Sequence, residues 1–105
     1  MRAIKLMPDY ECHPLWGVIP SEFVDIDPKT LPISTKLQQQ LRTWADTYDQ
    51  TLDREDPRQS GFSTALDVSA FEAEGERLAE QLRTELGSNY IVLTYIHAYV
   101  RTFFP

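Results

Sequence analysis

Cys12 and His13 are the first residues in the chain whose types could carry out a reaction. A cysteine acts as a nucleophile in its thiolate form, which needs a nearby base. Neighbours on an extended chain point to opposite faces, so His97 is a better base for Cys12 than His13. One hypothesis is therefore a small-molecule pocket or a minor hydrolase site formed by Tyr10, Cys12, Trp16 and His97. We favour the alternative, a small buried thiol and a solvated imidazole, and expect no catalytic residue.

The spacing of potential ligands does not indicate a metal or cofactor site. Structural zinc is usually held by ligands in spaced pairs. The sequence has one cysteine and contains neither C-x-x-C nor H-x-x-x-H. It also lacks a glycine-rich phosphate loop, and Ser60 and Gly61 lack the second glycine of a nucleophile elbow. We therefore expect neither a metal nor a cofactor.

A group of acidic residues in the middle of the chain is the second candidate site. Three of them lie on one side of an expected helix, and two more continue the charge beyond it: Asp46, Asp49, Asp53, Glu55 and Asp56. Such a surface could bind a basic partner. The alternative is a solvated face with weak ion pairs, because Arg42 precedes Asp46 by one helical turn.

Composition limits the classes of function. The chain has 105 residues, 42% of them hydrophobic and 25% charged, which is typical of one soluble globular domain. Its formal net charge of −6 disfavours nucleic acid as a partner and weakly favours a cationic protein. The single cysteine forbids an internal disulfide and fits a reducing compartment. No segment is typical of a signal peptide or membrane span, so we expect a cytoplasmic protein.

Two segments carry apolar or small residues at the same helical spacing. In 37–52 and in 71–86 these residues fall at offsets of 0, 4, 7, 8, 11 and 15. This spacing places them in one stripe along a helix. We expect two antiparallel amphipathic helices, over about 35–53 and 66–86, with their stripes buried.

The residues around these segments predict where the helices begin and end. Ser34 or Thr35 should start the first helix, with Thr35 matching a capping box. Ser69 matches a second capping box, and Asp67 is a rival cap for the second helix. Gly87 should end that helix.

Gly75 interrupts the apolar stripe of the second helix. A glycine inside a helix costs about 1 kcal/mol relative to alanine. Close approach by another part of the fold would compensate for this cost. Trp44 or Tyr48 is the expected neighbour.

The two ends of the chain predict a small sheet. Ala3–Met7 should form a short strand, with a second short strand at Phe23–Ile26. Asp9–Val18 has no helical period and predicts an ordered loop or an irregular edge strand. Tyr90–Val100 is rich in β-branched and aromatic residues, which indicates a strand buried on both faces, or a strand followed by an apolar tail. We expect an α+β fold in which the two helices pack on a sheet formed by the N- and C-terminal strands.

The segment MPDYECHPLW, Met7–Trp16, resembles the start of a family of small uncharacterised bacterial proteins. Later landmarks also resemble that family: Leu31–Ser34, Trp44 and Ala45, Tyr48 and Asp49, Ser60–Phe62, and Glu85–Gly87. The resemblance covers most of the chain and implies a bacterial, intracellular protein with one domain. It implies no known activity, so it assigns no functional residue.

The leading hypothesis from the sequence is that the protein is a small acidic module that binds another protein and has no enzymatic activity. An inhibitor or immunity-type protein that occupies a basic partner fits its size and charge. The alternative is the pocket or hydrolase described above. A further hypothesis is a homodimer built on the C-terminal strand and the tail, because exposed Phe103 and Phe104 would be unusual.

Overall fold

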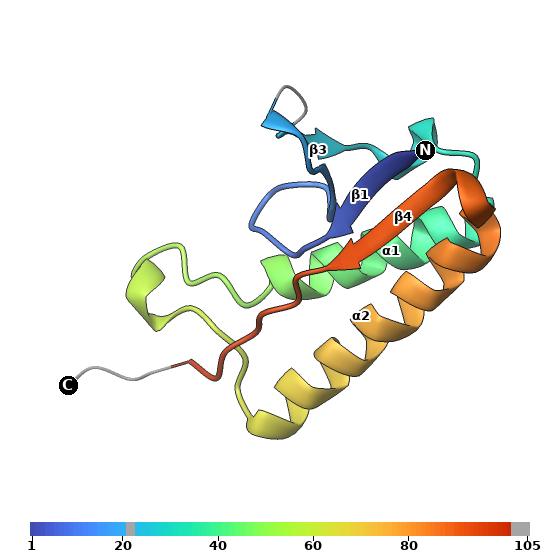
Figure 1. The fold of residues 1–105 in the computed structure, drawn as a ribbon. Helices are drawn as coiled ribbons and strands as arrows, with labels where there is room; N and C mark the ends of the chain where they lie inside the picture. The colour runs from blue at the N-terminus through green and yellow to red at the C-terminus, as the bar shows by residue number, and fades with distance from the viewer. Residues whose placement is uncertain (21–22, 102–105) are drawn as a thin grey trace.

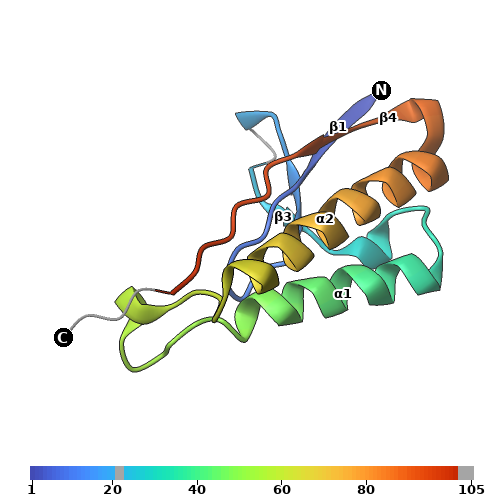
Figure 2. The same ribbon diagram turned by 90° about the horizontal axis from the view of Figure 1, so that it is seen from below.

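The computed structural model describes residues 1–20 and 23–101, which form an α+β fold of two layers. A four-stranded sheet has two helices packed on one face (Figures 1 and 2). The strands are β1 (Arg2–Leu6), β2 (Leu15–Gly17), β3 (Asp25–Ile26) and β4 (Tyr90–Thr94). The helices are α1 (Thr35–Asp49) and α2 (Ala65–Leu86), with short 3-10 turns η2 (Pro28–Thr30), η3 (Pro57–Gln59) and η4 (Gly87–Asn89). The two long helices run in opposite directions, as predicted (Figure 2).

The sheet joins the two ends of the chain. Its order is β3-β2-β1-β4, with β1 antiparallel to β2 and parallel to β4. The predicted pairing of the N- and C-terminal strands is confirmed. β2 lies inside the sheet between β1 and β3, so neither expectation for Asp9–Val18, a loop or an irregular edge strand, describes it fully. Three residues beside Pro14 are too few to show an alternating pattern in the sequence.

The hydrophobic core lies between the sheet and the helices. Inward residues of the strands, such as Ile4, Leu6 and Val92, are at most 5% exposed. Outward residues of β4 are not covered, because both helices lie on the same face of the sheet. Ile91 and Leu93 are 45% and 46% exposed, so the first of the two alternatives for Tyr90–Val100, a strand buried on both faces, is wrong. The regular strand also ends at Thr94, and the chain continues extended to a single bridge between Val100 and Phe62.

Both helices begin earlier than their predicted capping boxes. Ser34 is the N-cap of α1, where its Oγ accepts a hydrogen bond from the Leu37 amide at 3.1 Å. Thr64 is the N-cap of α2 and accepts from the Asp67 amide at 3.1 Å. Ser34 was one of the two alternatives for α1, whereas both predicted caps of α2, Ser69 and Asp67, are wrong because they lie inside that helix. The amide and the hydroxyl of Ser34 also donate hydrogen bonds to the Glu85 carboxylate. These bonds link the start of α1 to the end of α2, and they lower the pKa of Glu85.

The expected close approach at Gly75 is confirmed. A Cβ atom placed on Gly75 would lie 2.7 Å from Cζ2 of Trp44 and 2.7 Å from Cδ1 of Ile96. The Trp44 ring stacks on Phe71 with centroids 4.5 Å apart, and its Nε1 donates to the Phe71 carbonyl at 3.0 Å. Gly87 ends α2 with a φ of 70°, as the sequence predicts.

Candidate partner-binding site

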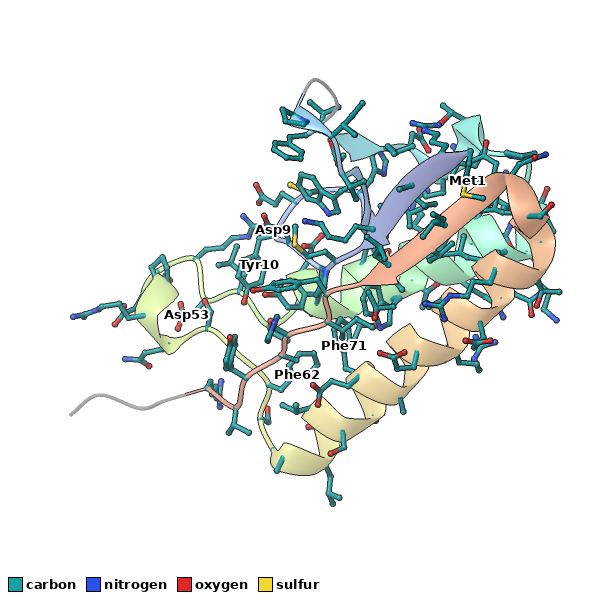
Figure 3. All side chains as sticks on the ribbon, in the orientation of Figure 1. Met1, Asp9, Tyr10, Asp53, Phe62 and Phe71 are labelled. Carbon is teal, nitrogen blue, oxygen red and sulfur yellow. The ribbon has the colours of Figure 1, made fainter. Side chains whose placement is uncertain are left out.

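The loop between β1 and β2 is fixed against the end of α1. Its ends are joined by a hydrogen bond from the Met7 amide to the Pro14 carbonyl at 2.9 Å. Tyr10, which is labelled in Figure 3, belongs to this loop. It stacks on Tyr48 of α1, with ring centroids 4.6 Å apart. The Tyr10 hydroxyl lies 3.1 Å from Oγ1 of Thr51. The loop therefore presents its remaining side chains from a fixed position.

Glu11 links this loop to α1 and to the loop after it. Its φ of 59° is in the left-handed region, which a residue with a Cβ adopts rarely. The Glu11 amide donates to Oδ1 of Asp49 at 2.9 Å, and its carboxylate pairs with Arg54 at 2.5 Å. These contacts hold a backbone conformation that is unfavourable by itself. They also bring the charges of three segments to one end of the molecule.

The predicted acidic residues gather at this end, but their surroundings differ. Asp53 accepts hydrogen bonds from the Glu55 and Asp56 amides, each at 3.0 Å, and shapes the loop after α1. Asp56 pairs with Arg58, and these hydrogen bonds lower the pKa of the Asp56 carboxyl. In residues 1–20 and 23–101, no hydrogen bond or ion pair engages the carboxylates of Asp46 or Glu55, and both residues are exposed. These two carboxylates remain available to another molecule.

More acidic residues gather at this end of the molecule than the sequence indicated. Asp9, Glu11 and Asp25 come from the β1–β2 loop and β3, yet all three act electrostatically on the same thiol, Cys12. Burial raises the pKa of Cys12, and the negative charges of Asp9, Asp25, Asp49 and Glu11 raise it further. No pattern along the chain connects these carboxylates, because the fold brings them together. We call the acidic end the set Asp9, Glu11, Asp25, Asp46, Asp49, Asp53, Glu55 and Asp56.

The surroundings of Cys12 also bear on the pocket hypothesis. A raised pKa disfavours the thiolate that a cysteine nucleophile needs. Within the described part of the chain, Cys12 makes no hydrogen bond to His13 or His97. The His13 amide donates to Asp25 at 2.8 Å, and its Nε2 lies 4.0 Å from Asp27. This environment favours the neutral thiol of Cys12 over the thiolate that a cysteine nucleophile requires.

Within the described part of the chain, no hydrogen bond or ring contact joins the other predicted pocket residues to one another. Trp16 belongs to β2 and its Nε1 donates to the Met7 carbonyl at 3.0 Å. His97 lies in the extended segment after β4, with its ring centroid 4.3 Å from that of Tyr95. Tyr10 packs on α1 as described above. The structure thus gives Tyr10, Trp16 and His97 separate neighbours.

An open cleft among the described residues lies elsewhere. It is an open hollow of about 1040 Å³ between α1, the start of α2 and the loop that joins them. Trp44, Phe62 and Phe71 contribute to its lining, together with glutamines and threonines of α1. Tyr10, Cys12, Trp16 and His97 are not among its lining residues. The buried stripes of α1 and α2 still meet through the ring stack of Trp44 and Phe71.

Tyr48 gives this region a pH dependence that can be measured. Burial raises the pKa of Tyr48 to about 12, and the neighbouring phenol of Tyr10 contributes. In the unfolded chain the phenol ionises near pH 10, so folding disfavours tyrosinate. The stabilisation is complete below about pH 10 and is lost as the pH rises towards 12. We expect urea unfolding to show a smaller loss of stability over this window in Tyr48→Phe than in wild type.

Tyr95→Phe is the matched control for this measurement, because Tyr95 is an exposed tyrosine that does not contribute to the raised pKa of Tyr48. Its pH profile should follow that of the wild-type protein. Equal alkaline losses in wild type and Tyr48→Phe would contradict the assignment to Tyr48.

The remaining features of the described chain concern metals and membranes. Residues 1–20 and 23–101 contain no group of three or more His, Cys, Asp or Glu side chains placed to hold a metal ion. The helices within these ranges are too short or too polar to cross a membrane.

Comparison with known proteins identifies a family match. A family model described as Serratia CdiI immunity protein-like matches residues 2–97. None of the curated proteins compared with the chain matches it.

Proposed function

Because the chain belongs to the Serratia CdiI immunity protein-like family, we propose that it is an immunity protein that inhibits a toxin by binding it. Membership of an immunity-type family implies a partner protein and fits the predicted inhibitor function. We propose further that the toxin is a basic protein and that the acidic end contacts it. An inhibitor that acts by binding its partner does not require a catalytic site.

The observation that carries this proposal is the gathering of carboxylates from four segments at one end of the fold. The β1–β2 loop, β3, α1 and the loop after α1 each contribute at least one. Contacts such as that between the Glu11 amide and Asp49 fix their positions before any partner arrives. A preformed surface with an excess of negative charge attracts a positively charged protein and favours its correct orientation.

Other hypotheses from the sequence stay predictions. The small-molecule or hydrolase site near Tyr10, Cys12, Trp16 and His97 would need Cys12 to ionise, which its neighbours oppose. The homodimer through the C-terminal strand is compatible with the position of β4 at the edge of the sheet. Phe103 and Phe104, which were expected to pack on the body or on another subunit, lie outside the described residues. We also propose a bacterial and cytoplasmic location.

The test uses the polypeptide encoded by the reading frame next to this one as the probe. We expect it to inhibit bacterial growth when expressed alone, and co-expression of this chain to restore growth. Affinity is then measured for the double variant Asp46→Lys/Glu55→Lys, whose original carboxylates hold no contact in the described residues. We expect binding to weaken by about tenfold or more, since opposed charges at an interface favour both association and orientation.

The matched control is Glu72→Lys/Glu76→Lys on α2, which changes the net charge by the same amount. This variant should bind within about twofold of wild type. Equal losses in both double variants would indicate an effect of total charge only and would contradict the proposed surface. No binding by the wild-type chain would contradict the proposed function itself.

A further inference from the structure

The outer face of the sheet is left uncovered by the two helices. Both helices lie on the opposite face (Figure 2), so alternate residues of each strand point away from the core. The strand register places Leu93 beside Lys5, Lys5 beside Trp16, and Trp16 beside Asp25. One row across the sheet therefore runs from an apolar residue at the β4 edge to a carboxylate on β3.

Along β4 the outer face is apolar and aromatic. Ile91, Leu93, Tyr95 and Tyr99 are 45%, 46%, 55% and 67% exposed. These residues alternate with inward ones from β4 into its extended continuation, over a length of about 26 Å. Exposed apolar residues that occur singly are normal, whereas a contiguous strip of this kind marks an interaction site. We call these four residues and Trp16 the outer strip.

Contacts with Lys5 and His97 order the side chains of Tyr95 and Tyr99 in the outer strip. Nζ of Lys5 lies 5.8 Å from the ring centroid of Tyr95. The His97 ring lies edge-on to Tyr95 at 4.3 Å and parallel to Tyr99 at 6.4 Å. Rigid aromatic side chains lose little conformational entropy on binding. Tyr95 and Tyr99 are therefore arranged in advance for contact with a partner.

Charge indicates which kind of molecule covers this strip. Asp25 belongs to the acidic end and pairs in register with Trp16 of the outer strip, so the two surfaces are continuous. A second copy of this chain would bring a second charge of −6 and a second acidic end to the same contact. Repulsion between like charges opposes that arrangement. A partner with an apolar patch bordered by Lys and Arg side chains fits both surfaces.

We propose that the outer strip is the apolar centre of the interface with the toxin, and that the acidic end is its charged border. This inference rests on the proposed function. Interfaces commonly have an apolar, aromatic centre in which a few Trp and Tyr residues dominate the binding energy, and a polar rim. The toxin then carries an apolar surface, surrounded by basic residues, that lies flat on the sheet of this chain.

The test compares Leu93→Ser and Tyr95→Ser with Leu66→Ser, using the same neighbour-encoded polypeptide. Leu66 is 82% exposed in the first turn of α2 and does not belong to the outer strip. We expect each strip variant to weaken binding by about tenfold or more, and Leu66→Ser to leave it within about twofold. If wild type and both strip variants bind equally while Asp46→Lys/Glu55→Lys binds weakly, the outer strip is excluded from the interface. The proposed function then still stands. If wild type does not bind, both proposals fail.

A measurement on the wild-type chain makes the test independent of substitutions. Hydroxyl-radical footprinting should show Tyr95 and Tyr99 protected in the complex, and unchanged labelling of both would overturn the inference. Sedimentation of the chain alone tests the other occupant of the strip. A dimer that Leu93→Ser dissociates and Leu66→Ser does not would assign the strip to a second copy and would also overturn the inference.

Discussion

Trp44→Ala is expected to lower the free energy of unfolding by about 3–5 kcal/mol, as for other large aromatic side chains removed from a core. Trp44 is 3% exposed and lies flat on Phe71, with an angle of 5° between the rings. Its removal also leaves a void beside Gly75, which has no side chain to fill it. A domain of this size has a total stability of roughly 5–10 kcal/mol, so the variant would be close to unfolding. Urea denaturation at neutral pH measures the change.

Two further variants separate the origins of this effect. Trp44→Phe keeps a ring on Phe71 but removes the hydrogen bond to the Phe71 carbonyl, so we expect an intermediate loss of about 1–2 kcal/mol. Trp16→Ala, on the outer face of the sheet, should cost less than Trp44→Ala because Trp16 is only partly buried. A loss of less than about 1 kcal/mol in Trp44→Ala would show that the ring stack does not support the contact between α1 and α2.

The architecture was predictable because its main signals are periodic and local. The stripes of the two helices identify their buried faces, and Leu41, Leu78 and Leu82 are fully buried as that period requires. Gly75 marked a close approach in the core, because an unfavourable glycine in a helix needs a compensating contact. The N-caps were less predictable, since several Ser, Thr and Asp residues near each helix start could serve.

The sheet was only partly predictable, for a physical reason. β2 is too short for alternation to be recognised, and its pairing depends on partners elsewhere in the sequence. For β4, hydrophobic composition suggested burial on both faces, but the number of helices that cover a sheet is a property of the whole fold. Ile91 and Leu93 are exposed because a second helical layer is absent from the described residues.

The candidate site combines local and long-range features. The group from Asp46 to Asp56 is visible along the chain, and the fold keeps it at one surface. The contributions of Asp9, Glu11 and Asp25 depend on the contact between the β1–β2 loop and α1. Only coordinates place Trp16 and Leu93 in one row across the sheet.

Gly75→Ala is expected to destabilise the protein by about 1–2 kcal/mol, although alanine is the better helix former. Helix propensity alone would favour the variant by about 1 kcal/mol. The added Cβ, however, would meet Trp44 and Ile96 at 2.7 Å, and overpacking of this kind costs about 1–3 kcal/mol or more. Ile96 can move the end of its flexible side chain. Trp44 cannot move as easily, because its stack on Phe71 and its hydrogen bond hold it.

Whether Gly75→Ala destabilises or stabilises the protein should therefore depend on the side chain at position 44. Phenylalanine lacks the second ring of the indole, which carries the Cζ2 atom that meets the new Cβ. In a Trp44→Phe background, Gly75→Ala should become neutral or stabilising, and urea denaturation of the four proteins in a double-mutant cycle measures the difference. Equal destabilisation by Gly75→Ala in both backgrounds would place the constraint on Ile96, whereas stabilisation in the wild-type background would show that helix propensity outweighs the contact. We predict that the effect of Gly75→Ala reverses because the Trp44 ring occupies the space that a Cβ atom on residue 75 would need. Where a fixed ring fills that space, a helix interior tolerates glycine.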